Sequence, residues 1–489
     1  MSVPEGESGA GKKVSPPQQA RQGPGRGRQR IPCPHGWRFD PAEGVPASGH
    51  RTAAAGWFFP EIILGRCGVY LYSSDMETTG GNLNVDESFF EPALRLLRHY
   101  CRHRRDTPEL SDEPFVRGGL LRVLGRCDSG RDFLQARQDR GEALARSTWF
   151  DALHSPRRAP LVAEVATRSY ELFDRFLQPR DWLGAFPELT GRAVWAVDGH
   201  QLQHAAHAAR GSKDEFISVG LIYGLCLHSG LQRALIPFQG DGVRRHEWPV
   251  FKQHLPRWLA QDRGEQLPIV VGDPAYLDVL HWALQKQRRQ AVLITREKEN
   301  MQPTVSSHDA FDPQDPVNRG VAADEMAGYA YADLRRISCC DPASGERFVF
   351  LTTETSLRPG LIALLYLLRW KIEKVFDVFK NKFHQQKAWA NGPTAAHTQA
   401  HFCALTHNLL TILLATLEQA GLSERKVEKK QQARRKATPR AQRVPAQERV
   451  RHASQLTCQF IRLVRHCLAH KTPWRVAFPL FQRRLESYL

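Results

Sequence analysis

The sequence lacks the features that mark membrane, secreted and zinc-binding proteins. No run approaches the roughly 18 to 20 apolar residues of a membrane span. The first thirty residues lack the apolar segment of a signal peptide. The ten cysteines include no C-x-x-C pair and no grouping with histidine at zinc-finger spacing. We therefore expect a cytoplasmic protein with reduced thiols and no membrane partner.

Acidic residues are outnumbered, with 51 Asp and Glu against 68 Lys and Arg, which gives a formal net charge of +17. Such a surface attracts polyanions, and nucleic acid is the commonest one. The chain of 489 residues, 42% of them hydrophobic, is long enough for several domains. The turn at residues 240–242 lacks the spacing of a phosphate-binding loop, so no nucleotide cofactor is expected.

The N-terminal part divides into a tail and a helical region. Residues 1–55 are rich in Gly, Pro, Ser and Gln and predict a disordered basic tail. Residues 56–185 predict a helical domain that binds DNA ends. Within it, residues 115–158 have the short amphipathic pieces of a helix-turn-helix reader of DNA, although plain helical packing explains them equally well.

The pattern then changes to alternating strands and helices, which predicts a mixed α/β core made of residues 186–299 and 359–420. Buried strands are expected at residues 193–197, 216–227, 233–238, 268–271 and 291–295. Residues 300–358 interrupt the core with a β-rich insertion, in which residues 334–340 and 347–353 look like a hairpin. A basic linker (421–452), either solvated or in contact with phosphates, and a C-terminal helical segment (453–489) complete the chain.

Two aspartates follow apolar strands in this core. Asp198 comes directly after Ala-Val-Trp-Ala-Val, and Asp273 follows Pro-Ile-Val-Val-Gly. Open α/β sheets place their sites at the carboxyl ends of strands. Hard cations such as Mg²⁺ prefer carboxylate oxygens. The two strand ends therefore predict a shared metal site, although a single Asp at such a position is more often a cap or turn residue.

A third acid lies on the predicted helix that begins at Pro359 and continues to about residue 382. With about 100° of rotation per residue, Tyr366, Arg369, Glu373 and Lys380 share a stripe roughly 60° wide. Apolar residues fill the opposite side of this helix. Basic residues beside a carboxylate suit the binding of phosphates next to a metal ion. This stripe predicts that Glu373 joins the two aspartates.

These residues match, spacing for spacing, the Y-x2-R-x3-E-x6-K signature, so the chain resembles the DDE transposases of the insertion-sequence-four type. Residues 369–373 resemble the family's R-W-x-I-E core, residues 273–276 its D-x-x-Y motif and residues 198–199 its D-G motif. The resemblance covers roughly residues 140–410. It implies an RNase H-like mixed sheet with flanking helices and a β-rich insertion between the second Asp and the Glu.

The resemblance also implies a function and a site. Asp198, Asp273 and Glu373 would be the catalytic residues and the ligands of two Mg²⁺ ions, with Mn²⁺ as a substitute. The residues that would bind DNA or its phosphates are Tyr366, Arg369, Trp370, Lys380 and Tyr276. The protein would cut transposon ends and transfer them into target DNA, as a homodimer associated with a prokaryotic nucleoid. The alternatives are an RNase H-like nuclease without strand transfer and a non-catalytic DNA-binding descendant.

Two positions depart from the family pattern. Asp377 lies one turn after Glu373, where some relatives carry a basic residue, so it either weakens phosphate binding or acts as a fourth acid. The insertion contains no Trp. In better-known relatives such a tryptophan stacks on a flipped base during a hairpin step. Here either Tyr329, Tyr331 or Phe350 takes its place or the step is absent.

Overall fold

The structure is a computed structural model of the whole chain. It describes residues 85–101, 109–125, 127, 129–177, 182–202, 217–241, 247–262, 266–340, 345–383, 388–417 and 446–485. The predicted basic tail lies outside these ranges, as does the predicted linker up to residue 445. Residues 446–452 of the predicted linker are instead the first turns of a helix.

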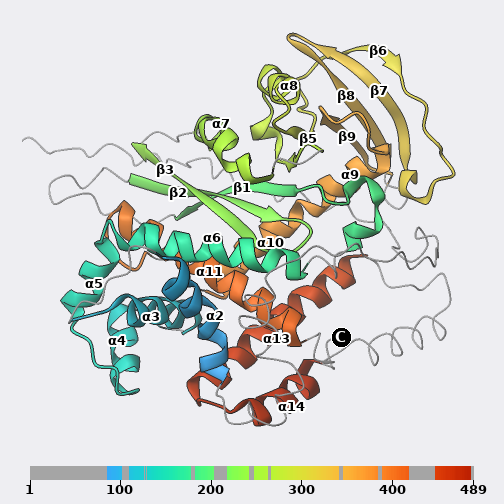
Figure 1. Cartoon of the computed structure of the whole chain (residues 1–489). Coiled ribbons are helices and arrows are strands. Elements are labelled where there is room, and N and C mark those ends of the chain that lie inside the picture. Colours follow the sequence, from blue (N-terminus) through green and yellow to red (C-terminus); the bar gives the residue numbers. More distant parts are fainter. Residues whose placement is uncertain are drawn as a thin grey trace, which may run out of the picture.

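The core of the chain is built on the first five strands of one mixed sheet (Figure 1). They are β1 (Val194–Leu202), β2 (Ile217–Cys226), β3 (Gln232–Asp241), β4 (Ile269–Val271) and β5 (Val292–Arg296). Their order is β3-β2-β1-β4-β5. Strand β1 pairs antiparallel with β2 and parallel with β4, and β4 pairs parallel with β5. This is the RNase H-like arrangement, and it confirms the predicted fold class and all five predicted core strands.

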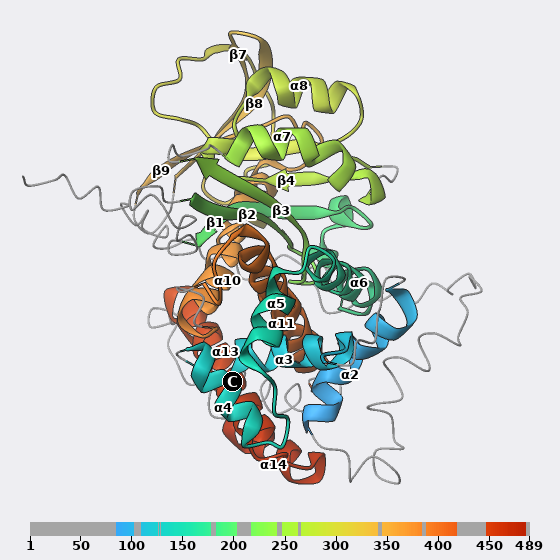
Figure 2. The ribbon, with the colours of Figure 1, turned by 90° about the vertical axis from the view of Figure 1, so that its left-hand side faces the viewer.

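The central strands are buried on both faces. Trp195 and Val197 of β1 pack in one apolar cluster, and Val194 and Ala196 pack in another. Because successive side chains of a strand point to opposite faces, this alternation needs a helical layer on each side. Helices α7 (Glu247–Trp258) and α8 (Val279–Gln287) cover one face. Helices α6, α10 and α11 lie on the other (Figures 1 and 2).

The insertion is an extension of the core sheet. Its strands are β6 (Thr304–His308), β7 (Val321–Tyr329), β8 (Ala332–Cys340) and β9 (Arg347–Thr352). Strand β9 pairs antiparallel with β5, and β8 with β9, as the predicted hairpin requires. The nine strands therefore form a single ladder in the order β3-β2-β1-β4-β5-β9-β8-β7-β6.

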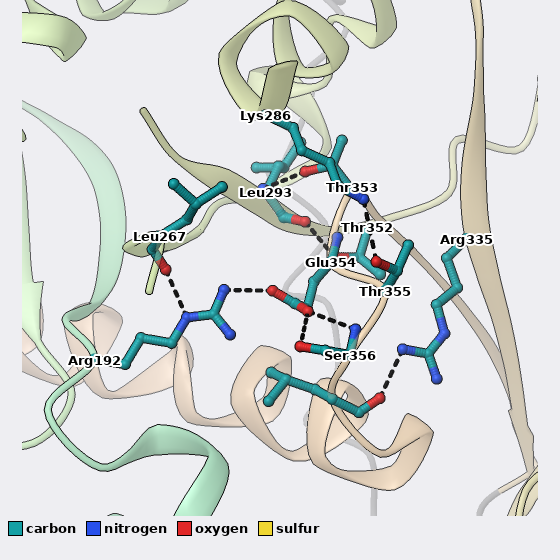
Figure 3. A network of polar contacts seen from close by, with 11 residues as sticks. Arg192, Leu267, Lys286, Leu293, Arg335, Thr352, Thr353, Glu354, Thr355 and Ser356 are labelled. Atoms are coloured by element: carbon teal, nitrogen blue, oxygen red, sulfur yellow. Dashed lines mark hydrogen bonds and ion pairs between the residues drawn. The ribbon is translucent and has the colours of Figure 1, made fainter. Parts of the chain in front are cut away.

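A buried ion pair fastens the entry of β1 to the segment that follows β9 (Figure 3). The Arg192 guanidinium contacts the Glu354 carboxylate and also donates from Nε to the Leu267 carbonyl at 2.6 Å. Glu354 accepts two further hydrogen bonds of 2.6 Å from the backbone N–H and hydroxyl of Ser356. Burial alone would raise the pKa of Glu354, but Arg192 and Ser356 outweigh it and the pKa is lowered. The pair thus joins three segments that are distant in sequence.

The helices before the sheet pack around α11 (Pro393–Leu417), which comes after it. They are α2 (Val85–Tyr100), α3 (Asp112–Leu124), α5 (Arg146–His154) and α6 (Arg158–Leu177). Helix α4 (Gly130–Gln138) lies between α3 and α5 in the sequence. A Cβ on Gly119 of α3 would come within 2.1 Å of the Phe402 ring of α11, so only glycine permits this approach. This helical layer is one of the two between which the sheet is held.

The basic pair at the end of the predicted helix-turn-helix is used inside the protein. Arg157 donates two hydrogen bonds of 2.7 Å to Asp112, which is fully buried. Arg158 also contacts Asp112, at 3.2 Å, and lies 4.7 Å from the centre of the Phe115 ring. Both arginines therefore tie α3 to the start of α6, which fits the packing alternative for this segment.

Two further helices follow, α13 (Ala446–Ala469) and α14 (Trp474–Leu485). They pack on each other, and α13 also packs on α2. Within the described ranges, none of the helices is both long and apolar enough to cross a bilayer.

Candidate active site

The two aspartates stand side by side on parallel strands. Ala196 of β1 pairs with Val271 of β4, and Asp198 and Asp273 each lie two residues further along. Asp198 is inside β1, which continues to Leu202, so its predicted place at the strand's end is wrong. It is β4 that ends early. Asp273 therefore leaves the sheet at the level of Asp198, and the two carboxylates share one edge.

Asp273 also has a structural role. Its Oδ1 accepts a hydrogen bond of 2.9 Å from the Ala275 N–H and so caps the short 3₁₀ turn η7 (Pro274–Tyr276). Capping turns the carboxylate toward the start of the turn and holds it beside β1. The two interpretations of this residue, cap and candidate ligand, are thus compatible.

The third acid comes from a helix that is interrupted at a single residue. The predicted helix over residues 359–382 is instead α9 (Pro359–Leu368) followed by α10 (Trp370–Asn381). The Arg369 N–H points to the carbonyls of both Leu365 and Tyr366, at 3.2 Å each. The Ile372 N–H bonds the Arg369 carbonyl at 3.0 Å, an i to i+3 bond that tightens the turn.

Arg369 connects the acids from the helix and the sheet. Its guanidinium lies 2.8 Å from Oε1 of Glu373 and 3.7 Å from Oδ2 of Asp198. The indole N–H of Trp370 donates to the other oxygen of Glu373. Arg369 is 7% exposed, so its charge is held largely out of water. The structure therefore brings Asp198, Asp273 and Glu373 to one place, with a buried cation between the first and the last.

Burial dominates the electrostatics of Asp198. It raises the pKa of this carboxyl to about 8; Arg369 opposes the rise, and Asp273, Glu247 and Glu373 add to it. Burial disfavours the charged form of an acid, and neighbouring negative charges do the same. A proton therefore competes with a cation for this carboxylate near neutral pH.

This raised pKa predicts how metal binding depends on pH. A metal ligand must be deprotonated, so below pH 8 a proton competes with the cation for Asp198. The apparent affinity for Mn²⁺ should weaken by up to about tenfold for each pH unit below 8 and level off above it. Titration calorimetry at pH 6, 7, 8 and 9 measures this. An affinity that does not change from pH 6 to 8 would contradict the raised pKa.

The residues at this site fit a divalent cation by their chemistry. Among the described residues, no three His, Cys, Asp or Glu side chains are already grouped to hold a metal ion. Arg369 supplies positive charge between Asp198 and Glu373 instead. Carboxylate oxygens are the donors that Mg²⁺ prefers. Gly199, directly after Asp198, has no side chain, and the Glu247 carboxylate occupies the space that a Cβ would fill.

The other predicted site residues lie in different surroundings. Tyr366 is half-buried against the Phe350 ring, 5.1 Å between centroids, with the Arg369 guanidinium 5.5 Å from its own ring. Lys380 is exposed toward the end of α10. Tyr276 is 1% exposed, and its hydroxyl donates to Glu247, so it offers DNA no surface. The Trp370 indole donates a hydrogen bond to Glu373, and the Lys374 ammonium lies 4.4 Å from the centre of the indole ring.

The two departures from the family pattern can now be located. Asp377 is exposed and accepts a hydrogen bond of 2.6 Å from Asn381 on its own helix. Of the insertion's aromatic residues, Phe350 is buried and the Tyr329 hydroxyl donates to Glu297 at 2.9 Å. Tyr331 is 72% exposed in the turn between β7 and β8. It is the most exposed of the three.

Sequence reasoning missed one acid of the cluster. Glu247, the first residue of α7, contributes to the raised pKa of Asp198. Its carboxylate lies against Gly199, where a Cβ would come within 2.0 Å of the carboxyl carbon. The only sequence signal was that glycine, because an Asp-Gly pair inside a strand marks a close approach.

The fold and the site define an RNase H-like protein with carboxylates gathered beside the end of β4. Residues 194–409 match the family model described as the transposase DDE domain. This match supports a DDE transposase, and it spans every strand of the sheet as well as α9, α10 and most of α11. Domains of this family generally depend on divalent metal ions.

Two solved structures resemble the chain at low sequence identity. A piggyBac transposase in a synaptic complex with hairpin DNA aligns with a TM-score of 0.35 and 9% identity, over 72% of this chain and 78% of that chain. Endonuclease V from Streptomyces avermitilis aligns with a TM-score of 0.20 and 14% identity, over 37% of this chain and 73% of that chain. No curated protein matches the sequence.

Proposed function

We propose that the protein is a DNA transposase of the insertion-sequence-four type that cuts transposon ends and joins them to target DNA. The observation that carries this proposal is the meeting of Asp198, Asp273 and Glu373 in a domain that matches the transposase DDE family. The net charge of +17 suits a polyanionic partner. A homodimer on paired ends follows from the same resemblance.

Asp198, Asp273 and Glu373 would hold two divalent cations, Mg²⁺ or Mn²⁺. When bound, such a pair activates an attacking oxygen and stabilises the leaving oxygen in phosphoryl transfer. The protein's own residues prepare the site. Trp370 fixes the rotamer of Glu373, and the cap at Ala275 fixes Asp273. Preformed carboxylate geometry lowers the cost of reaching the reactive arrangement.

Three basic or aromatic side chains would position the DNA backbone. Arg369 is the one closest to the acids, and its guanidinium suits bidentate binding of a phosphate. Tyr366 lies under that guanidinium and limits its movement. Lys380, exposed on α10, would bind a phosphate further along the strand. In this scheme Arg369 exchanges its contact with Asp198 for one with DNA.

The proposal is tested with the purified protein, labelled terminal repeats of the element that encodes it, and a target plasmid. We expect nicking or cutting at the repeat ends that requires Mg²⁺ or Mn²⁺, and covalent joining of a pre-cut end to the plasmid. Cleavage without any joined product would favour the plain nuclease. Specific end binding with neither reaction would favour the non-catalytic DNA-binding protein.

A further inference from the structure

The last two helices of the structure carry basic residues without acidic ones. The chain from residue 457 to residue 485, which covers the second half of α13 and all of α14, contains no Asp or Glu. Its Lys and Arg residues are Arg462, Arg465, Lys471, Arg475, Arg483 and Arg484. Positive charge that no nearby acid compensates creates a local field that attracts a polyanion.

One of these arginines is used inside the protein. The Arg465 guanidinium donates to the carbonyl of Lys382 at the end of α10, the helix that carries Glu373. The two C-terminal helices also pack on each other, and the rings of Phe460 and Phe481 have centroids 5.8 Å apart. In both views α14 lies on the side of the helical layer that faces away from the sheet (Figures 1 and 2). The pair of helices is therefore attached to the core at a defined place.

Helix α14 has a buried apolar face and an exposed basic face. With about 100° of rotation per residue, the exposed residues 475, 476, 479 and 483 fall within a sector about 100° wide. The buried Ala477, Phe481 and Leu485 lie on the other side of the helix. A helix binds a membrane surface through its apolar face. In α14 that face is already packed against the protein, so the basic face is the one offered to a partner.

The two arginines on this face are not held by acids. Among the described residues, neither Arg475 nor Arg483 forms an ion pair. The Nε of Arg483 points to the Pro479 carbonyl of its own helix, at 3.4 Å. A guanidinium presents its donors in a planar fork that matches the oxygens of a phosphate. Unlike Arg157 and Arg465, these side chains therefore keep their charge available to a ligand.

The spacing of Arg475 and Arg483 matches a dimension of duplex DNA. At about 1.5 Å of rise per residue, the two positions are about 12 Å apart along the helix axis. The major groove of B-DNA is also about 12 Å wide. Guanidiniums at this spacing reach phosphates on opposite sides of the groove. Val476, which is 54% exposed on the same face, would then lie toward the bases, where apolar side chains contact the thymine methyl group.

We propose that α14 is a DNA-contacting helix that lies across the major groove of the transposon end, with Arg475 and Arg483 on its phosphates. This inference rests on the proposed function, because that function supplies the DNA duplex. Since α14 lies on the side of the helical layer away from the sheet, it contacts the duplex away from the carboxylates (Figures 1 and 2). Its contribution is to binding and not to the chemical step.

The experiment measures binding of the full chain to a labelled terminal-repeat duplex by fluorescence anisotropy at several salt concentrations. Arg475→Gln combined with Arg483→Gln removes two phosphate contacts. We expect binding to weaken by about 10- to 100-fold. We also expect the slope of log affinity against log salt concentration to become shallower by about 2. Unchanged thermal unfolding shows that the double variant is folded.

Two matched variants separate this contact from a general effect of charge. Arg257→Gln combined with Arg288→Gln removes the same charge from exposed arginines of α7 and of the end of α8, on the other face of the sheet. This control should keep the affinity and slope of the wild type. Arg475→Lys combined with Arg483→Lys keeps the charge and should recover most of the slope. An equal loss in the control would mean that net charge alone sets the affinity, and would overturn the inference.

An RNA duplex of the same length tests the placement in a groove. The major groove of A-form RNA is deep and narrow, so a helix cannot enter it. The wild type and the Arg475→Gln, Arg483→Gln variant should therefore bind this duplex with similar affinity. A loss as large as that on DNA would contradict a helix lying in the major groove.

The possible results separate this inference from the proposed function. If the Arg475→Gln, Arg483→Gln variant binds DNA with the wild-type slope and the wild type cuts DNA ends, the role of α14 is overturned and the transposase proposal stands. If the slope falls in this variant while the wild type binds ends without cutting or joining them, the contact is supported and the transposase is not. Absence of DNA binding by the wild type overturns both.

Discussion

Replacing Asp273 by Asn is expected to reduce Mg²⁺-dependent end cleavage by about a thousandfold, equivalent to about 4 kcal/mol of transition-state stabilisation. The amide keeps an oxygen that can cap η7 at Ala275, so the turn should keep its shape while the metal-binding charge is lost. Binding of labelled ends, measured by gel shift, should change little. Cleavage and binding on the same DNA give the two readouts.

The chain offers a matched control for this variant. Asp315 also precedes a proline and caps a 3₁₀ turn, η8 (Pro316–Asn318), through a hydrogen bond of 2.9 Å from the Val317 N–H. Asp315→Asn should leave cleavage near the wild-type rate, because this carboxylate pairs with Arg358 and not with the acids of the site. Retained Mg²⁺-dependent cleavage by Asp273→Asn would refute the assignment of Asp273.

Removing one partner of the Arg192–Glu354 pair is expected to lower the free energy of unfolding by about 3 to 5 kcal/mol. Both side chains are buried, at 4% and 6% exposure, so Arg192→Ala leaves an uncompensated carboxylate inside the protein. The segments that contain Leu267 and Glu354 would both lose their contact with residue 192 (Figure 3). The midpoint and slope of urea unfolding measure the effect.

The matched control replaces both partners with apolar residues of similar size, Arg192→Met with Glu354→Leu. This double variant should recover much of the loss, because no buried charge remains. Breaking the more exposed pair Lys252–Asp278 should cost at most about 1 kcal/mol. If Arg192→Ala lowers the free energy of unfolding by less than about 1 kcal/mol, the buried pair contributes little to stability.

The same pair predicts a pH dependence. The folded-state pKa of Glu354 is lowered, so the unfolded chain takes up this proton more readily than the folded one. The stabilisation is therefore complete above the unfolded value near 4.5 and is lost as the pH falls through the lowered folded value. Stability of Glu354→Gln should change less than that of the wild type across this acidic range.

The core strands were predictable because their signals are local. The run before Asp198 alternates between two apolar clusters, and β4 is buried at every position. Apolar runs bounded by Gly and Pro predict buried strands without any knowledge of the fold. The order of the acids along the chain was equally visible. The sequence does not show that Ala196 pairs with Val271, which is the register that places the two aspartates beside each other.

The remaining features depend on contacts between distant segments. Nothing near Glu247 in the sequence indicates that its carboxylate meets Gly199, since α7 reads as an ordinary amphipathic helix. The break at Arg369 lies inside a continuous helical pattern, and tertiary contacts with Asp198 accompany it. Likewise, the basic character of Arg158 suggested DNA, whereas the buried Asp112 decides its place. Local secondary-structure propensity contains no information about such distant partners.

The pairing of β9 with β5 has a mechanical consequence. A β-rich insertion tethered by two loops would swing about its attachment points. Here each strand is hydrogen-bonded to the next, from β4, next to Asp273, to β6 at the far edge of the sheet. The distance between the outer strands and the carboxylates is therefore fixed when the chain folds. A force applied to the insertion would be distributed over the hydrogen bonds of the whole sheet.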